Sequence, residues 1–136
     1  MMFAVIITAT SQSKLVFKDK FMYSNVQIFN DKNEYSTSSL IDTGSSLCII
    51  DSIFAIDSCG IKESELETVY VNQNRTKIST TIIDSLAFCG KTYTKIHCLV
   101  ADLSGIYQKY APKFIIGANI LKQGAWKFDM EKSIIE

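Results

Sequence analysis

The sequence predicts a mainly-β, barrel-like domain with one or two short helices. Segments such as Phe21–Phe29 and Thr80–Phe88 alternate apolar and polar residues or are rich in threonine and isoleucine, which is typical of half-buried strands. Polar sequences such as Asn30-Asp31-Lys32-Asn33 separate them, and Asn and Asp tolerate the left-handed backbone of tight turns. The 136 residues contain no repeat or linker, so we expect residues 1–136 to form a single domain.

The first half of the chain is expected to form a terminal strand and then a hairpin. The apolar run Phe3–Thr8 predicts a strand, so residues 1–20 are interpreted as a terminal strand or extension. Phe21–Phe29 and Tyr35–Ile41 are predicted to pair across the Asn-Asp turn. The second arm of this hairpin would end at Asp42.

The remaining elements are expected to be short strands, turns and brief helices. In order they are a helix from Asp51 or Ser52 to Cys59 that ends at Gly60, a hairpin of Val69–Val71 and Thr76–Ile78, a hairpin of Thr80–Phe88 and Tyr93–Val100 turned at Gly90-Lys91, a helical turn within Ser104–Tyr110, the buried run Phe114–Gly117, a helix Ala118–Gln123 that ends at Gly124, and a hairpin of Trp126–Asp129 and Ser133–Glu136.

Composition excludes several classes of function. Fourteen basic residues balance fourteen acidic ones, which disfavours nucleic acid and anionic membrane surfaces as partners. No apolar run approaches the roughly 20 residues that cross a bilayer, and the first residues lack the basic segment of a signal peptide. We therefore expect a soluble, cytoplasmic protein.

The cysteines do not form a metal-binding pattern. Cys48, Cys59, Cys89 and Cys98 include no Cys-x-x-Cys pair, and the single histidine is His97, whereas zinc sites usually offer closely paired ligands. We expect no metal, no cofactor and free, mostly buried thiols.

One stretch carries recognisable chemistry. In Leu40-Ile41-Asp42-Thr43-Gly44-Ser45 two apolar residues lead into an acid, a hydroxyl residue, a glycine and a serine. A buried strand would deliver one carboxylate to a sharp turn, glycine would permit the tight backbone, and the hydroxyls could hydrogen-bond around the acid. The tripeptide alone arises by chance in roughly one chain in twenty of this length, so the surrounding elements decide its meaning.

Asp42-Thr43-Gly44-Ser45 resembles the active-site loop of the retropepsin-like aspartic proteases. In that family an apolar pair and a glycine cross beneath the loop and are followed by a helix and a final hairpin; Ile115-Ile116-Gly117 and the residues after it are similar to this ending. The resemblance covers the chain from about Phe21 to the C-terminus. It implies the acid-protease barrel and an aspartic endopeptidase acting on peptide or protein substrates.

The resemblance also implies a symmetric homodimer, because aspartic proteolysis needs two carboxylates that share one proton. Only Asp42 lies in a suitable motif: Asp57-Ser58-Cys59-Gly60 has an extra residue, and Asp102-Leu103-Ser104-Gly105 has leucine in place of the hydroxyl. Each subunit would therefore give one Asp42 to a site on the two-fold axis. A monomer would be inactive.

The family's roles map onto single residues. Asp42 would be the acid/base, Thr43 would brace the loop against its partner, and the Gly44 carbonyl would bind the substrate backbone. The Ser45 hydroxyl would donate to Asp42 and make the activity optimum more acidic than in Ser45→Ala. The hairpin tip Asn72-Gln73-Asn74-Arg75 would close over the substrate, although it lacks the glycines of retroviral enzymes.

Two alternatives stay open at this stage. A non-catalytic domain could keep this fold for dimerisation or peptide binding, since fold alone does not determine function. Alternatively, Asp42-Thr43-Gly44-Ser45 could be an ordinary turn at a strand end, with the carboxylate solvated.

Overall fold

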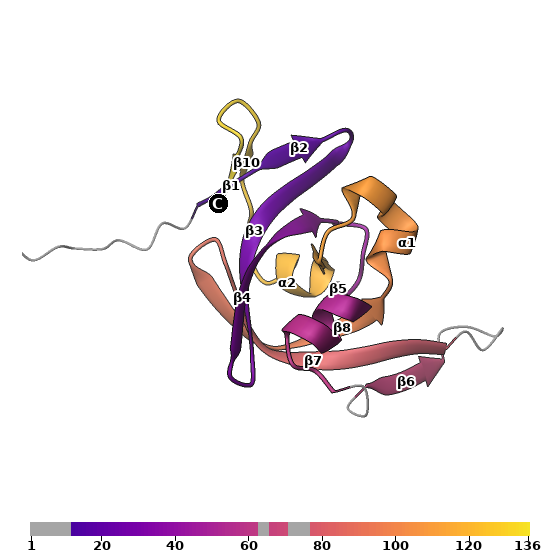
Figure 1. Cartoon of the computed structure of the whole chain (residues 1–136). Coiled ribbons are helices and arrows are strands. Elements are labelled where there is room, and N and C mark those ends of the chain that lie inside the picture. The colour runs from indigo at the N-terminus through magenta and orange to yellow at the C-terminus, as the bar shows by residue number, and fades with distance from the viewer. Residues whose placement is uncertain (1–11, 63–65, 71–76) are drawn as a thin grey trace, which may run out of the picture.

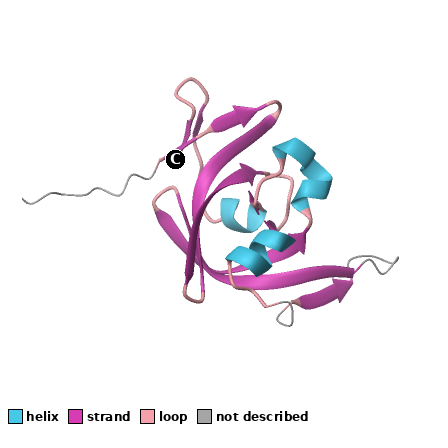
Figure 2. Cartoon of the chain, in the orientation of Figure 1, coloured by secondary structure: helices cyan, strands magenta, loops and turns pink. Residues whose placement is uncertain are grey.

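The computed structural model of the protein describes residues 12–62, 66–70 and 77–136. Two predicted features lie outside these ranges: the strand at Phe3–Thr8 and the hairpin tip Asn72-Gln73-Asn74-Arg75. Strands dominate the described chain, and the helical segments are short (Figure 2).

The described elements follow one another in a fixed order (Figure 1). They are β1 (Ser13–Lys14), β2 (Val16–Lys18), β3 (Phe21–Asn30), β4 (Asn33–Ile41), β5 (Cys48–Asp51), the π-helical segment η1 (Phe54–Ser58), β6 (Glu67–Tyr70), β7 (Lys77–Phe88), β8 (Lys91–Ala101), α1 (Leu103–Tyr107), the 3₁₀ turn η3 (Gln108–Tyr110), β9 (Phe114–Ile116), α2 (Ala118–Leu121), β10 (Phe128–Asp129) and β11 (Ile134–Ile135).

Six of the described strands close into a barrel. Their order is β3-β4-β9-β5-β8-β7, and β7 pairs again with β3 to complete the ring. β9 runs parallel to β4 and antiparallel to β5, while β5 runs parallel to β8. A smaller sheet of β1, β11 and β10 lies at the C-terminal end of the chain, and β6 extends with β7 away from it (Figure 1). The predicted mainly-β barrel is confirmed.

Alternation along the strands divides the apolar side chains between two clusters. On β3, Val26 and Ile28 are buried while Asn25 and Gln27 are exposed, as a period of two requires. On β4, Ile41 belongs to the core inside the barrel, whereas Leu40 points to a second cluster on the outer face of the sheet. This second cluster lies beneath α1.

Two local predictions need correction. The sequence predicts Thr76–Ile78 and Thr80–Phe88 as separate arms, but Lys77–Phe88 is one continuous strand, because it pairs first with β6 and then with β3. The turn that follows is Cys89-Gly90 rather than Gly90-Lys91. Both turn residues have positive φ angles, 52° and 73°, as a two-residue hairpin turn of this kind needs.

The segment after β5 is helical, as the sequence predicts, but with wider turns than an α-helix. The Cys59 amide donates to the Phe54 carbonyl at 3.0 Å, five residues back. Gly60 has a φ of 70° and ends the segment, since glycine adopts this conformation without steric cost. The four cysteines are buried and free. Among the described helices, none is long and apolar enough to cross a membrane.

Candidate active site

The Asp42 loop follows directly from β4 and is held by backbone hydrogen bonds to β9 and within the loop itself. The Asp42 amide donates to the Ile116 carbonyl at 3.0 Å, and the Ser45 amide donates to the Asp42 carbonyl at 3.3 Å, which closes a tight turn. The Gly44 amide donates to Oδ1 of Asp42 at 2.9 Å. Because this amide fixes one carboxylate oxygen, the side chain is oriented by the turn that carries it.

The other oxygen of Asp42 accepts no hydrogen bond from the residues that the structure describes. The side chain is only partly buried, and within the described part of the chain the Gly44 amide is the one donor to the carboxylate. An ionised carboxylate has about four acceptor positions, so Asp42 retains capacity to bind a water molecule or a second carboxylic acid. This is the geometry expected of a reactive acid rather than a structural one.

Gly44 and Gly117 lie where there is little room for a side chain. Gly44 does not have a positive φ angle, so the left-handed conformation does not explain it; a Cβ there would lie 3.3 Å from Oδ1 of Asp42. At Gly117 a Cβ would lie 2.3 Å from the Leu47 carbonyl oxygen and 2.5 Å from its carbon. The backbone after the active loop therefore passes directly over Gly117.

The structure brings Ile115, Ile116 and Gly117 beneath the loop. β9 lies between β4 and β5, with Ile115 opposite both Leu40 and Ile49. All three residues from Ile115 to Gly117 are buried. At the start of α2 the Ala118 amide donates to the Ser45 carbonyl at 2.7 Å. The loop is thus supported on both flanks by one short segment.

Asn119 is a supporting residue that sequence reasoning missed. Its Oδ1 accepts the Cys48 amide at 2.9 Å, and its Nδ2 donates to the His97 carbonyl at 3.0 Å. One side chain therefore fastens α2 to both β5 and β8. A single asparagine in a short helix carries no distinctive pattern, because its partners lie 71 and 22 residues away in the sequence.

The predicted bond from Ser45 to Asp42 is wrong. The Ser45 hydroxyl donates to the Leu47 carbonyl at 2.7 Å. The hydroxyl therefore stabilises the second half of the loop, where the chain enters β5. Because a hydroxyl has one proton to donate, the predicted acidic shift of the activity optimum loses its basis.

The two near-miss motifs do not form a second active loop. Asp57 is exposed on η1. Asp102 is the N-cap of α1: its carboxylate accepts the Ser104 hydroxyl at 2.6 Å and the Gly105 amide at 3.2 Å. These bonds, the Ser104 hydroxyl first, lower the pKa of Asp102, since they favour the ionised form. Asp42 is the carboxylate that this fold places in a glycine turn over β9.

Tyr107 is a further residue whose side chain interacts electrostatically with Asp42. Burial raises the pKa of its phenol, and the negative charge of Asp42 raises that pKa further. Its ring packs edge-on against Phe21, with centroids 5.6 Å apart. A tyrosine in a short helix carries no local sequence pattern that would predict its interaction with an acid in the distant Asp42 loop.

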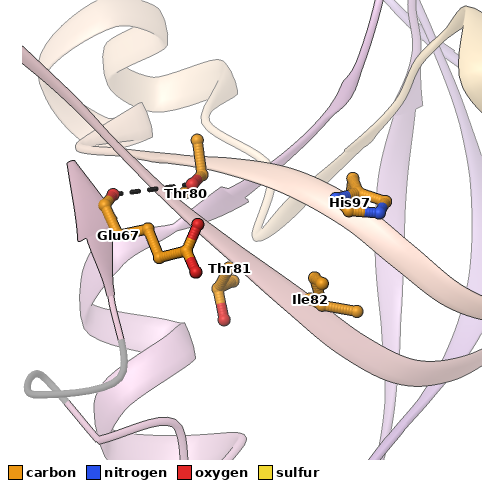
Figure 3. A pocket seen from close by; sticks show the side chains of 5 residues that line it. All are labelled: Glu67, Thr80, Thr81, Ile82 and His97. Carbon is orange, nitrogen blue, oxygen red and sulfur yellow. Dashed lines mark hydrogen bonds between the residues drawn. The ribbon is translucent and has the colours of Figure 1, made fainter. Parts of the chain in front are cut away.

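A separate cavity of about 230 Å³ lies on the β6–β8 side and is lined by Glu67, Thr80, Thr81, Ile82 and His97 (Figure 3). None of these belongs to the Asp42 loop, although the backbone carbonyl of His97 accepts the bond from Asn119 that fastens α2 to β8. The Thr80 hydroxyl is 3.5 Å from the Glu67 carbonyl in this cavity. Within the described ranges, no three His, Cys, Asp or Glu side chains are arranged to hold a metal ion.

Comparison with known proteins agrees with this architecture. A model of the family described as aspartyl protease matches residues 25–120. A crystal structure of a retropepsin-like aspartic protease from Rickettsia conorii matches with a TM-score of 0.64 and 18% sequence identity, and the match covers 91% of this chain and 87% of that chain. No curated protein sequence matches this chain. The structural likeness confirms the retropepsin-like barrel.

Proposed function

This chain belongs to the aspartyl protease family, and we propose that it is an aspartic endopeptidase that works as a symmetric homodimer. The observation that carries the proposal is the Asp42 carboxylate, held through Oδ1 by the Gly44 amide, while its second oxygen has no donor in the described part of the chain. Hydrolysis through a water molecule needs two such carboxylates sharing a proton. Each chain supplies one, so two chains complete the site.

Each residue of the loop has a distinct part in the proposed reaction. One Asp42 accepts a proton from the attacking water, while its twin donates a proton to the oxygen of the scissile carbonyl. The exposed Thr43 braces one loop against the other across the two-fold axis. The Gly44 carbonyl accepts a hydrogen bond from the substrate backbone. Ile115, Ile116 and Gly117 support the loop from below and keep Asp42 in position.

The titration of the proposed pair follows from its symmetry. Two identical carboxylates at close range cannot both ionise at the same pH, so the pair loses its protons in two separate macroscopic steps. Activity requires the state with a single proton and should therefore rise and fall across an acidic range of pH.

The first experiment compares wild type with Asp42→Asn on a peptide library from acidic to neutral pH. We expect pepstatin-sensitive cleavage by wild type and a loss of at least about 1000-fold in Asp42→Asn. Asp57→Asn is the matched control, because Asp57 lies exposed on η1. Absence of cleavage by a protein shown to be dimeric would favour the non-catalytic alternative.

The second experiment tests whether two chains share one site. Wild type is mixed with an equal amount of Asp42→Asn and allowed to exchange subunits. If the site needs both copies of Asp42, about a quarter of the dimers remain active after random exchange, so activity per wild-type chain falls by about half. Activity per wild-type chain that is unchanged by mixing would contradict a shared site.

A further inference from the structure

The outer face of the sheet beside Asp42 is already covered by the chain itself. Leu40, two residues before Asp42, points to this face, and Ile115 lies directly opposite it on β9. Both side chains are closed to solvent, with exposures of 3% and 0%. In a peptide-binding cleft, these two positions would otherwise offer apolar surface to a substrate side chain next to the carboxylate.

This face is covered by the segment that consists of α1 and η3, from Leu103 to Tyr110. Hydrogen bonds anchor the segment at both ends. At its start, the Leu103 amide donates to Oδ1 of the buried Asp51 at 3.0 Å. At the end of η3, the Tyr110 carbonyl accepts the Tyr23 hydroxyl at 2.6 Å. Leu103 and Tyr107 of this segment pack on the cluster that contains Leu40 and Ile115. The segment is therefore held in place over the apolar surface of Leu40 and Ile115.

Tyr107 is the residue of this segment that both packs on the cluster containing Leu40, two residues before Asp42, and interacts electrostatically with Asp42. Its side chain is half-buried, and its ring meets the Phe21 ring at 76°. Burial and the charge of Asp42 both raise the pKa of its phenol, and Tyr23, which interacts electrostatically with Tyr107 and Tyr110, is the other ionisable group of the cluster. Three nearby cations lie over other rings: Lys18 over Tyr23 at 5.2 Å, Lys20 over Phe21 at 5.8 Å and Lys109 over Tyr110 at 5.1 Å.

We propose that Tyr107 is a specificity-determining residue, which fills the space beside Asp42 and restricts the adjacent substrate position to a small side chain. This inference rests on the proposed function. A large apolar side chain would need the surface of Leu40 and Ile115, which α1 has taken. In a symmetric dimer the two copies of Tyr107 flank the scissile bond, so the preference for glycine, alanine or serine applies on both sides of the cut.

The position of Tyr107 can be tested without any catalysis. The ultraviolet titration of wild type minus that of Tyr107→Phe isolates this one phenol among the six tyrosines. We expect its pKa to fall when Asp42 is replaced by Asn in both proteins, and to stay unchanged with Asp57→Asn. A difference titration that is unaffected by Asp42→Asn would overturn the placement of Tyr107 beside the carboxylate.

The specificity is tested by profiling cleavage with peptides that vary in size next to the cut. Relative to alanine peptides, Tyr107→Ala should cleave leucine and phenylalanine peptides about tenfold faster than wild type does, since removing bulk from a pocket changes discrimination on this scale. Tyr107→Phe keeps the bulk and should keep the wild-type preference. Ile106→Ala, at a side chain 66% exposed on the same helix, is the surface control.

The outcomes separate the two proposals. A folded Tyr107→Ala with the wild-type size preference would overturn the specificity role but not the endopeptidase. If Tyr107→Ala does not fold, Tyr107→Val serves as the smaller apolar replacement, with the same gain expected. A wild type that cleaves no peptide would overturn the proposed function and the specificity role together, while the phenol titration would still report where Tyr107 lies.

Discussion

Two stretches of this chain have nearly the same local sequence but place their acids differently. Leu40-Ile41-Asp42-Thr43 and Ile49-Ile50-Asp51-Ser52 each run from aliphatic residues into an aspartate and a hydroxyl residue. Asp51 is 5% exposed, and its two oxygens accept the Phe54 amide at 3.2 Å and the Leu103 amide at 3.0 Å. Asp42 is half-exposed and accepts only the Gly44 amide among the described donors.

The difference lies in the backbone after each acid. Beyond Asp51 the chain becomes helical, and the free Phe54 amide at the start of this helix donates to Oδ2. The other oxygen, Oδ1, accepts the Leu103 amide at the start of α1. Beyond Asp42, Gly44 permits a close turn that uses one oxygen only. A carboxylate with both oxygens bonded is a structural link between β5, η1 and α1. A carboxylate with one oxygen free can handle a proton.

Gly117→Ala should lower the free energy of unfolding more than the other substitutions, because Gly117 packs against Leu47 in the segment between Asp42 and Asp51. An added Cβ would lie 2.3 Å from the Leu47 carbonyl oxygen, and a backbone atom cannot move aside cheaply. We expect the free energy of unfolding, measured with urea, to fall by about 3 kcal/mol or more. Gly44→Ala is the control and should cost about 1 kcal/mol, since its Cβ would meet a side-chain oxygen at 3.3 Å. Equal midpoints for Gly117→Ala and wild type would contradict this prediction.

Replacing each acid by alanine tests the comparison directly. Asp51→Ala leaves the buried Phe54 and Leu103 amides without an acceptor, which should cost about 3 kcal/mol in unfolding free energy. Asp42→Ala exposes one amide to solvent and should cost less than about 1 kcal/mol while abolishing activity. Denaturation and activity are measured on the same samples. A larger stability loss in Asp42→Ala than in Asp51→Ala would reverse the assignment.

The cysteines give a prediction about pH for the β5 side of the comparison. Burial raises the pKa of Cys48 and of Cys59 from 9.0 to about 11, so the folded state favours the neutral thiols. Stability should be intact below about pH 9 and should fall as the pH rises towards 11, by about 2 kcal/mol for each thiol. Urea midpoints between pH 8 and pH 10.5 measure this, and Cys59→Ala should flatten the slope. A midpoint independent of pH over this range would show that burial does not control these thiols.

Sequence reasoning located the barrel and the Asp42 loop because both depend on short-range patterns. Alternation in β3, the turn residues after it and the glycines near Asp42 and Ile116 are all visible within a few residues. The hydrogen bonds of the Asp42 loop were harder to predict from the sequence. Ser45 has several carbonyls and a carboxylate within reach, and only the path of the chain into β5 selects Leu47.

Asn119, Tyr107 and the bond from Asp51 to α1 were beyond sequence reasoning for a different reason. The partners of Asn119 and Asp51 lie on other elements, up to 71 residues away, and the approach of Tyr107 to Asp42 depends on how α1 folds over the outer face. Such contacts arise from the closure of the barrel. The similar sequences around Asp42 and Asp51 make the same point, since the local pattern alone does not separate the partly exposed carboxylate from the buried one that bonds through both oxygens.

Ser45→Ala should have the smallest effect and refines the account of Asp42. Its hydroxyl donates to the Leu47 carbonyl at 2.7 Å, so alanine should lower the free energy of unfolding by about 1 kcal/mol. Because this hydroxyl does not serve Asp42, the pH dependence of cleavage should match that of wild type. Rates measured across the acidic range decide this, with Ser46→Ala, an exposed neighbour, as the control. An optimum displaced towards neutral pH would mean that Ser45 turns to the carboxylate in the proposed dimer, and that a second donor, as at Asp51, is compatible with catalysis.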